Sequence, residues 1–316
     1  MKNGKKRRFA EMAVLLCAAV GIFGYSAAAS YDEEDAVKIT LEQDASVVSG
    51  KGASVDENTI TISSGGSYYI SGTLEDGQIC VEADGSDTVV LMLAGVDITN
   101  ESEPAIYIEN AESTILYLVD ETENQVQSGV DTGNSAADGE ADENAEGGVI
   151  YAKDDLVLSG SGFLTVSGFI NNGIQTSNNL TIESGTITVD AVNNGIKGKD
   201  SVTILGGTIA VTSGGDGIKS DDTTGEGYGV IALEGGAIQI ESGEDGVQAE
   251  TVLTISDGEI LITAGGGSAD AETVSNDFGF GSFAENWDME DEDAESTKGM
   301  KSGTELQILG GTVNVD

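Results

Sequence analysis

Residues 193–222 read NNGIKGKDSVTILGGTIAVTSGGDGIKSDD, and this stretch holds two copies of one pattern. Asn194-Gly195-Ile196 and Asp216-Gly217-Ile218 begin the two copies, and their glycines are 22 residues apart. After each start, apolar residues alternate with polar ones, which is typical of β-strands. The stretch therefore predicts a repeat of about 22 residues that is built from short strands.

The repeat continues on both sides of this stretch. Gly173 precedes Gly195 by 22 residues, Gly246 follows Gly217 by 29, and Gly299 follows Gly246 by 53. Five columns of aliphatic residues or Met align across the copies. The first column contains Val149, Ile174, Ile196, Ile218, Val247 and Met300. A single copy cannot bury such residues, whereas stacked coils can bury each column as a ladder.

These columns predict an all-β fold, a parallel β-helix with three short strands per coil of about 22 residues. Glycines at the turns would supply the positive φ that is needed where the chain changes face. A sandwich or barrel is the alternative, but antiparallel strands would not require so regular a spacing.

The chain divides into three predicted parts. Residues 1–29 form a signal peptide, 30–57 a lead-in segment, and 58–316 the β-helix, in which 58–130 form less regular first coils. Acidic insertions interrupt the β-helix at 131–147 and 268–297. The last residues, Gly310 to Asp316, stop partway through a coil, so we expect the C-terminal end to be incomplete.

The prediction of a signal peptide rests on the first 29 residues. Five basic residues lie between Met1 and Arg8, an apolar run extends from Met12 to Tyr25, and small residues follow up to Ala29. We therefore expect a bacterial protein that is secreted or held at the cell surface, with no stable membrane insertion after cleavage. An uncleaved anchor is the alternative, although the run is shorter than the roughly 20 residues that span a bilayer.

Composition excludes several classes of function. The chain has no His, so it has neither a Ser-His-Asp triad nor a His-ligated metal site. Asp and Glu total 56 against 13 Lys and Arg, and a net charge of −43 disfavours nucleic acid as a partner. Cleavage after Ala29 would leave Cys80 alone, so no intramolecular disulfide could form.

Several motifs resemble one bacterial protein family. They are GSYYISGTL at 66–74, AIYI at 105–108, NNGIKGKD at 193–200, GGDGIKSDD at 214–222 and GEDGVQAE at 243–250. The family is that of secreted carbohydrate-binding proteins with a right-handed parallel β-helix, similar in fold to pectate lyases. The resemblance covers roughly 37–316. It implies binding of cell-surface polysaccharide, of cellulose or polygalacturonate type, together with bound calcium, and it does not imply catalysis.

Acidic side chains are candidates for a Ca²⁺ site. Stacked coils would place Asp216 above Asp245 at the repeat starts, and carboxylates this close repel unless a cation offsets them. Ca²⁺ binds six to eight oxygen ligands of this kind. The candidates are Asp216, Asp221, Asp222 and Asp245, with Asp200, Glu244 and Glu250 as weaker ones. A solvated acidic face is the alternative. Asn172 and Asn194, in the equivalent positions, would form an asparagine ladder.

Lys197, Lys219 and Trp287 are the candidate ligand-binding residues. The two lysines each follow a core Ile and could contact sugar carboxylates, act as a general base, or compensate the surrounding acids. Trp287 could stack on a sugar ring or anchor its own insertion. We therefore predict a calcium-dependent, non-catalytic protein that binds plant-cell-wall-type or other acidic or β-linked glycans. A calcium-dependent pectate-type lyase and a structural or adhesin solenoid are the alternatives.

Overall fold

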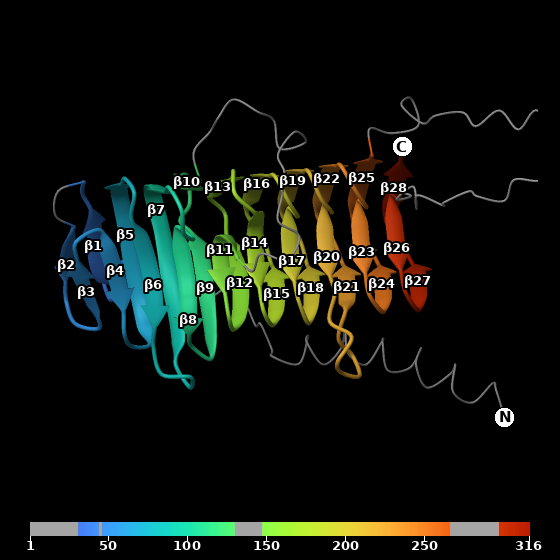
Figure 1. The fold of residues 1–316 in the computed structure, drawn as a ribbon. Helices are drawn as coiled ribbons and strands as arrows, with labels where there is room; N and C mark the ends of the chain where they lie inside the picture. Colours follow the sequence, from blue (N-terminus) through green and yellow to red (C-terminus); the bar gives the residue numbers. More distant parts are fainter. Residues whose placement is uncertain (1–30, 44–45, 130–146, 266–296) are drawn as a thin grey trace, which may run out of the picture.

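A computed structural model describes residues 31–43, 46–129, 147–265 and 297–316. The described residues form 28 strands and no helix, so the fold is all-β. Within these ranges, no helix is long and apolar enough to cross a membrane. The predicted signal peptide and Trp287 lie outside the described residues, as do almost all positions of both acidic insertions. The strands are stacked side by side along one long axis, broadly in the order of the sequence (Figure 1).

Ten strands form the first stack, which is a sheet of its own. In chain order they are β3 (Ala53–Asp56), β4 (Thr59–Ile62), β6 (Gln78–Glu82), β8 (Ile106–Asn110), β11 (Gly148–Ala152), β14 (Asn172–Thr176), β17 (Ile196–Gly198), β20 (Ile218–Ser220), β23 (Val247–Ala249) and β26 (Met300–Ser302). All neighbours pair in parallel except β3 and β4, which pair antiparallel.

The second and third stacks belong to one larger sheet. The second contains β9 (Ser113–Leu118), β12 (Asp155–Gly160), β15 (Asn179–Ile182), β18 (Ser201–Ile204), β21 (Val230–Leu233), β24 (Val252–Ile255) and β27 (Glu305–Ile308). The third contains β10 (Glu123–Ser128), β13 (Phe163–Gly168), β16 (Thr186–Ala191), β19 (Thr208–Ser213), β22 (Ala237–Ser242), β25 (Glu259–Ala264) and β28 (Thr312–Val315).

The N-terminal strands connect these two stacks. β7 (Thr88–Asn100) pairs with β9 along its first half and with β10 along its second half. β5 (Gly66–Leu74) lies beside β7, and β1 (Val37–Leu41) lies beside β5, all in parallel. β2 (Val47–Ser49) then pairs antiparallel with β1. Antiparallel pairs thus end both sheets on the N-terminal side.

The predicted apolar columns lie inside the stacks and bury one another. Leu180, Val202, Ile231 and Leu253 pair in succession in the second stack, and each is fully buried. Between uninterrupted coils the paired residues are 22 positions apart, as for Ile174 and Ile196. One alignment from the sequence was wrong, because Ile150 rather than Val149 pairs with Ile174. Both side chains are buried, so the apolar pattern could not separate them.

The repeat glycines serve a different purpose from the one that the sequence suggested. A Cβ on Gly195 would lie 2.2 Å from Val211 and 2.8 Å from the Gly217 carbonyl oxygen, and φ at Gly195 is not positive. Gly is therefore required there for close packing. Positive φ occurs instead at the turns that lead into the third stack, as at Gly207 (φ 97°) and Gly258 (φ 110°).

Candidate functional site

Lysines gather in one outward-facing column of the first stack. Strand register places Lys197 beside Lys219, Lys219 beside Gln248, and Gln248 beside Lys301. In the other direction the column continues through Gln175, Tyr151 and Tyr107. We call this set the lysine column. None of its members is acidic, in a chain with 56 Asp and Glu residues.

A ladder of side-chain oxygens runs beside the lysine column, at the start of the same strands. The Oδ1 atom of Asn172 accepts the Asn194 backbone N–H at 3.0 Å, and Asn194 Oδ1 accepts that of Asp216 at 3.1 Å. Asp216 Oδ1 accepts the Asp245 N–H at 2.9 Å, and Asp245 Oδ1 accepts the Lys298 N–H at 2.8 Å. The predicted asparagine ladder therefore exists, and the two aspartates continue it.

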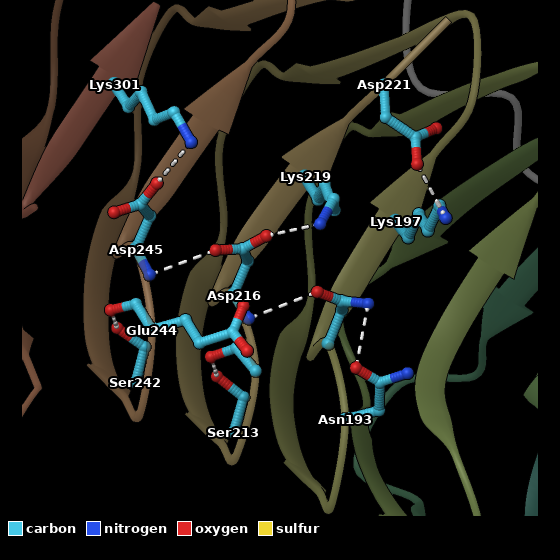
Figure 2. Close-up of polar contacts among 12 residues, drawn as sticks. Asn193, Lys197, Ser213, Asp216, Lys219, Asp221, Ser242, Glu244, Asp245 and Lys301 are labelled. Carbon is cyan, nitrogen blue, oxygen red and sulfur yellow. Dashed lines mark hydrogen bonds and ion pairs between the residues drawn. The ribbon is translucent and has the colours of Figure 1, made fainter. Parts of the chain in front are cut away.

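Each ladder carboxylate has a lysine at its second oxygen. Lys219 Nζ lies 2.7 Å from Asp216 Oδ2, and Lys301 Nζ lies 3.2 Å from Asp245 Oδ2 (Figure 2). Asp216 is only 1% exposed, so its charge needs a partner. Burial acts to lower the pKa of Lys219, but the carboxylates around it, Asp216 above all, together outweigh burial, so the pKa is raised. Lys219 is therefore held in its charged form.

The chain also contains a neutral version of this pair. In the coil of Asn172, the residue three positions on is Gln175, and Asn172 Nδ2 donates to Gln175 Oε1 at 2.6 Å. Asp216 and Lys219 have the same spacing. The ladder thus accepts either two amides or an ion pair, because both satisfy the polar groups that face each other.

A family model for carbohydrate-binding domain-containing proteins matches residues 56–316. The chain belongs to this family. A carbohydrate-binding domain-containing protein from Acetivibrio thermocellus is 39% identical over 140 residues, which cover 44% of this chain and 48% of the relative. The chain thus aligns with about half the length of this relative. A solved polysaccharide lyase-like protein from C. thermocellum, a gadolinium derivative, has a TM-score of 0.71 at 32% identity, with coverage of 88% of this chain and 99% of the other.

Lys197, the other predicted lysine of this family member, is paired differently. Its Nζ lies 2.8 Å from Asp221 Oδ2, which comes from the next coil. The Lys197 and Asp221 side chains are 19% and 30% exposed, so solvent reaches both. Moving the Lys197 ammonium group from Asp221 to an external anion would therefore cost less free energy than moving the Lys219 ammonium group away from the buried Asp216.

Asp200 and Asp222 form a second acidic site, at the turn between the first and second stacks. Burial raises the pKa of Asp200 to about 6, and a hydrogen bond with Asp222 adds to the shift. Asp222 accepts the Thr224 backbone N–H at 2.6 Å, and this contact lowers its pKa. Below about pH 6, Asp200 therefore carries a proton that it can donate to the ionised Asp222.

This pair predicts a pH dependence of stability. Between about pH 4 and pH 6 the folded protein holds a proton on Asp200 that the unfolded chain has lost, so the free energy of unfolding falls as pH rises through this window. Asp200→Asn should remove the fall and raise stability at pH 7 by about 1 kcal/mol, after allowance for solvent screening. Urea unfolding at pH 4.5 and pH 7.5 measures the effect, with the exposed Asp97→Asn as control. Equal pH slopes in the parent and Asp200→Asn would contradict it.

The structure separates the predicted metal ligands into three places. Asp216 and Asp245 are in the ladder, and Asp200 and Asp222 are at the turn. The backbone of Glu250 lies beside that of Asp221, just after the ends of β23 and β20. Glu244 precedes Asp245, and its charge acts on Lys219. Among the described residues, no three Asp, Glu, Cys or His side chains are arranged to hold a metal ion. Asp216 and Asp245 do not fit Ca²⁺, because lysines and backbone N–H groups take their oxygens.

Sequence reasoning missed Lys301, Gln248, Gln175 and the two tyrosines of the lysine column. Tyr107 and Tyr151 stack with ring centroids 5.7 Å apart, and Lys153 Nζ lies 5.5 Å from the Tyr107 ring. In the sequence, the signal for these residues was their position, because each member of the lysine column directly follows an apolar residue of the first stack. It was hidden at Tyr151 by the misalignment of Val149, whereas Lys301 directly follows Met300, which the columns had already aligned, so the spacing could have found it.

Proposed function

We propose that this family member is an extracellular, non-catalytic polysaccharide-binding protein that holds acidic glycans on the lysine column. The observation that carries the proposal is the single line of Lys197, Lys219 and Lys301. Five of the thirteen Lys and Arg residues lie within the first eight positions, so these three are a large share of the remaining eight. Lysines concentrated on one face of an acidic protein favour an anionic ligand there.

The spacing of the column supports a linear polymer as the ligand. Neighbouring parallel strands lie about 4.8 Å apart, which is close to the length that one ring adds to an extended polysaccharide. A uronate-containing chain along the stack would then bring successive carboxylates near successive coils. The family description and the polysaccharide lyase-like neighbour support a polysaccharide as partner.

Three finer features belong to the same proposal. Secretion rests on the signal-peptide pattern of residues 1–29. The right hand of the coil rests on the strong preference of parallel crossover connections for that hand. A calcium requirement rests on the family resemblance and on the close carboxyl groups of Asp200 and Asp222, whose repulsion a divalent cation would relieve.

A binding measurement tests the proposal. Lys197→Gln combined with Lys301→Gln should weaken binding to polygalacturonate about tenfold, because two partly exposed charge contacts of up to about 1 kcal/mol each are lost. Gln already occupies the column at 175 and 248, and circular dichroism checks that the variant still folds when Asp245 loses its lysine. Lys38→Gln with Lys51→Gln removes the same charge elsewhere and serves as control.

The same titration in calcium and in chelator tests the calcium requirement. If calcium is needed, chelator lowers the affinity of the parent protein and its melting temperature together. If the lysine variant and the control variant bind with equal affinity, the lysine column is not the binding site. If the affinity and the melting temperature of the parent protein are the same in calcium and in chelator, the calcium requirement is wrong and the rest of the proposal stands.

A polysaccharide lyase is the second candidate, because the solved neighbour is described as polysaccharide lyase-like. Lys219 is poorly suited to be its general base, since the ion pair with Asp216 raises its pKa and keeps it protonated. Lys197 would have to leave Asp221 to act. Steady formation of unsaturated uronate products, followed by absorbance and lost in Lys197→Gln, would establish the lyase instead.

A further inference from the structure

A small cavity lies at the corner where third-stack strands β10 and β13 end and first-stack strands β11 and β14 begin. The described residues line an open pocket of about 140 Å³ there. This is far more than one water molecule needs and matches a single sugar ring better than a drug-sized ligand. The lining residues that matter here are Glu103, Pro104, Ser128, Val149, Ile170 and Asn171.

The walls of the cavity are of two kinds. Pro104, Val149 and Ile170 give apolar surface, and Ile170 is 44% exposed. Glu103 and Asn171 are among the polar residues of the lining, and Glu103 brings a negative charge to it. A pyranose ring presents the same combination, with C–H groups on its faces and hydroxyls at its edge. No Lys or Arg lines the cavity, so a uronate carboxylate would meet Glu103 without a counter-charge.

Hydrogen bonds hold the polar part of the cavity in place. Ser128 Oγ donates to the Glu103 carbonyl at 2.5 Å, and Asn193 Nδ2 donates to Asn171 Oδ1 at 2.9 Å. Asn172, a lining residue that is 2% exposed, donates to the Gly147 carbonyl at 3.0 Å. A cavity whose walls are already fixed loses little conformational entropy when a ligand binds.

The cavity and the lysine column share the strand β14, which contributes Asn172 to the cavity lining and Gln175 to the column. Asn172 bonds to Gln175, and Gln175 lies beside Lys197 in the strand register. We propose that the cavity binds one neutral hexopyranose ring of the same glycan whose uronates contact the lysines. The inference rests on the proposed function and narrows the ligand to a chain that contains both neutral and acidic sugars.

Two glycans and two matched variants test this assignment. The glycans are polygalacturonate and a soluble polymer that alternates uronate with a neutral hexose. Ile170→Asn removes an apolar wall without adding charge, and Leu205→Asn makes a similar change at a residue of similar exposure, 42%. Ile170→Asn should weaken binding to the alternating polymer about tenfold and leave polygalacturonate binding unchanged, whereas Leu205→Asn should change neither. Circular dichroism checks that both variants fold.

The outcomes separate this inference from the proposed function. If Ile170→Asn binds both polymers as the parent does, or if the parent binds polygalacturonate alone, the cavity assignment is wrong and the lysine column stands. If the parent binds neither polymer, the proposed function fails and the cavity assignment fails with it. A Glu103→Gln variant gives a second check, because removal of the carboxylate should let polygalacturonate bind more tightly than it binds the parent.

Discussion

Replacing Ile209 by Asp is expected to unfold the β-helix. Ile209 is 1% exposed and pairs with Ile187 and Ile238 inside the third stack. A carboxylate there would have no partner, and an unpaired buried charge costs several kcal/mol, a large part of the stability of an ordinary domain. Thermal melting followed by circular dichroism should show either no cooperative transition or one that is lower by more than about 10 °C.

Thr208→Asp is the matched control, since Thr208 is the preceding residue of the same strand and faces solvent. The two variants carry the same new charge on opposite faces of β19. If both melt like the parent protein, the inward columns are not the core of the molecule and the parallel register is wrong.

Replacing Asp216 by Ala is expected to have the second largest effect. The change leaves the half-buried Lys219 without its counter-charge and the Asp245 N–H without an acceptor. Breaking such a pair by removal of one partner costs about 3–5 kcal/mol and should lower the melting temperature by roughly 10 °C. Asp216→Asn should cost less, because its side-chain oxygen still accepts the N–H.

The double variant Asp216→Asn, Lys219→Gln should then recover most of the stability that the single change to Asn loses. It copies the pair that Asn172 and Gln175 already form in another coil. A double-mutant cycle over melting or urea unfolding gives the coupling between positions 216 and 219 directly. Additive losses in the cycle would show that the ion pair is not the unit that stabilises the ladder.

Spacing alone predicted much of the fold. A constant interval of 22 residues fixes which apolar residues stack, and the columns through Leu180 and Ile187 pair as expected. The misalignment of Val149 arose because residues just before it are an insertion, so no fixed interval led to that coil. The first strands were recognisable from alternation, but their antiparallel pairing at β1–β2 and β3–β4 has no periodic signal.

The candidate site was less predictable, because the repeat spacing determines which residues lie in adjacent coils but not which side chains form ion pairs. Lys219 pairs within its own coil, Lys197 with the following coil and Lys301 with the preceding one. Side-chain length and burial decide among these choices, and neither follows from the interval. Compensation of the surrounding acids by Lys197 and Lys219 was one of the alternatives that the sequence left open, and both lysines do pair with carboxylates. The cavity was missed because its walls come from three coils between residues 102 and 172.

The constant register between coils also bears on how such a gene can change. Ile174, Ile196 and Ile218 occupy equivalent places 22 residues apart, and each strand contacts only the coils next to it. Recombination between the DNA segments that encode neighbouring coils would insert or delete a whole coil in frame and leave the strand pairing intact. A duplication of the segment for residues 194–215 would add one lysine to the column and one side chain to the ladder in a single event. The number of charges offered to a glycan can thus evolve through copy number, without any point mutation in the core.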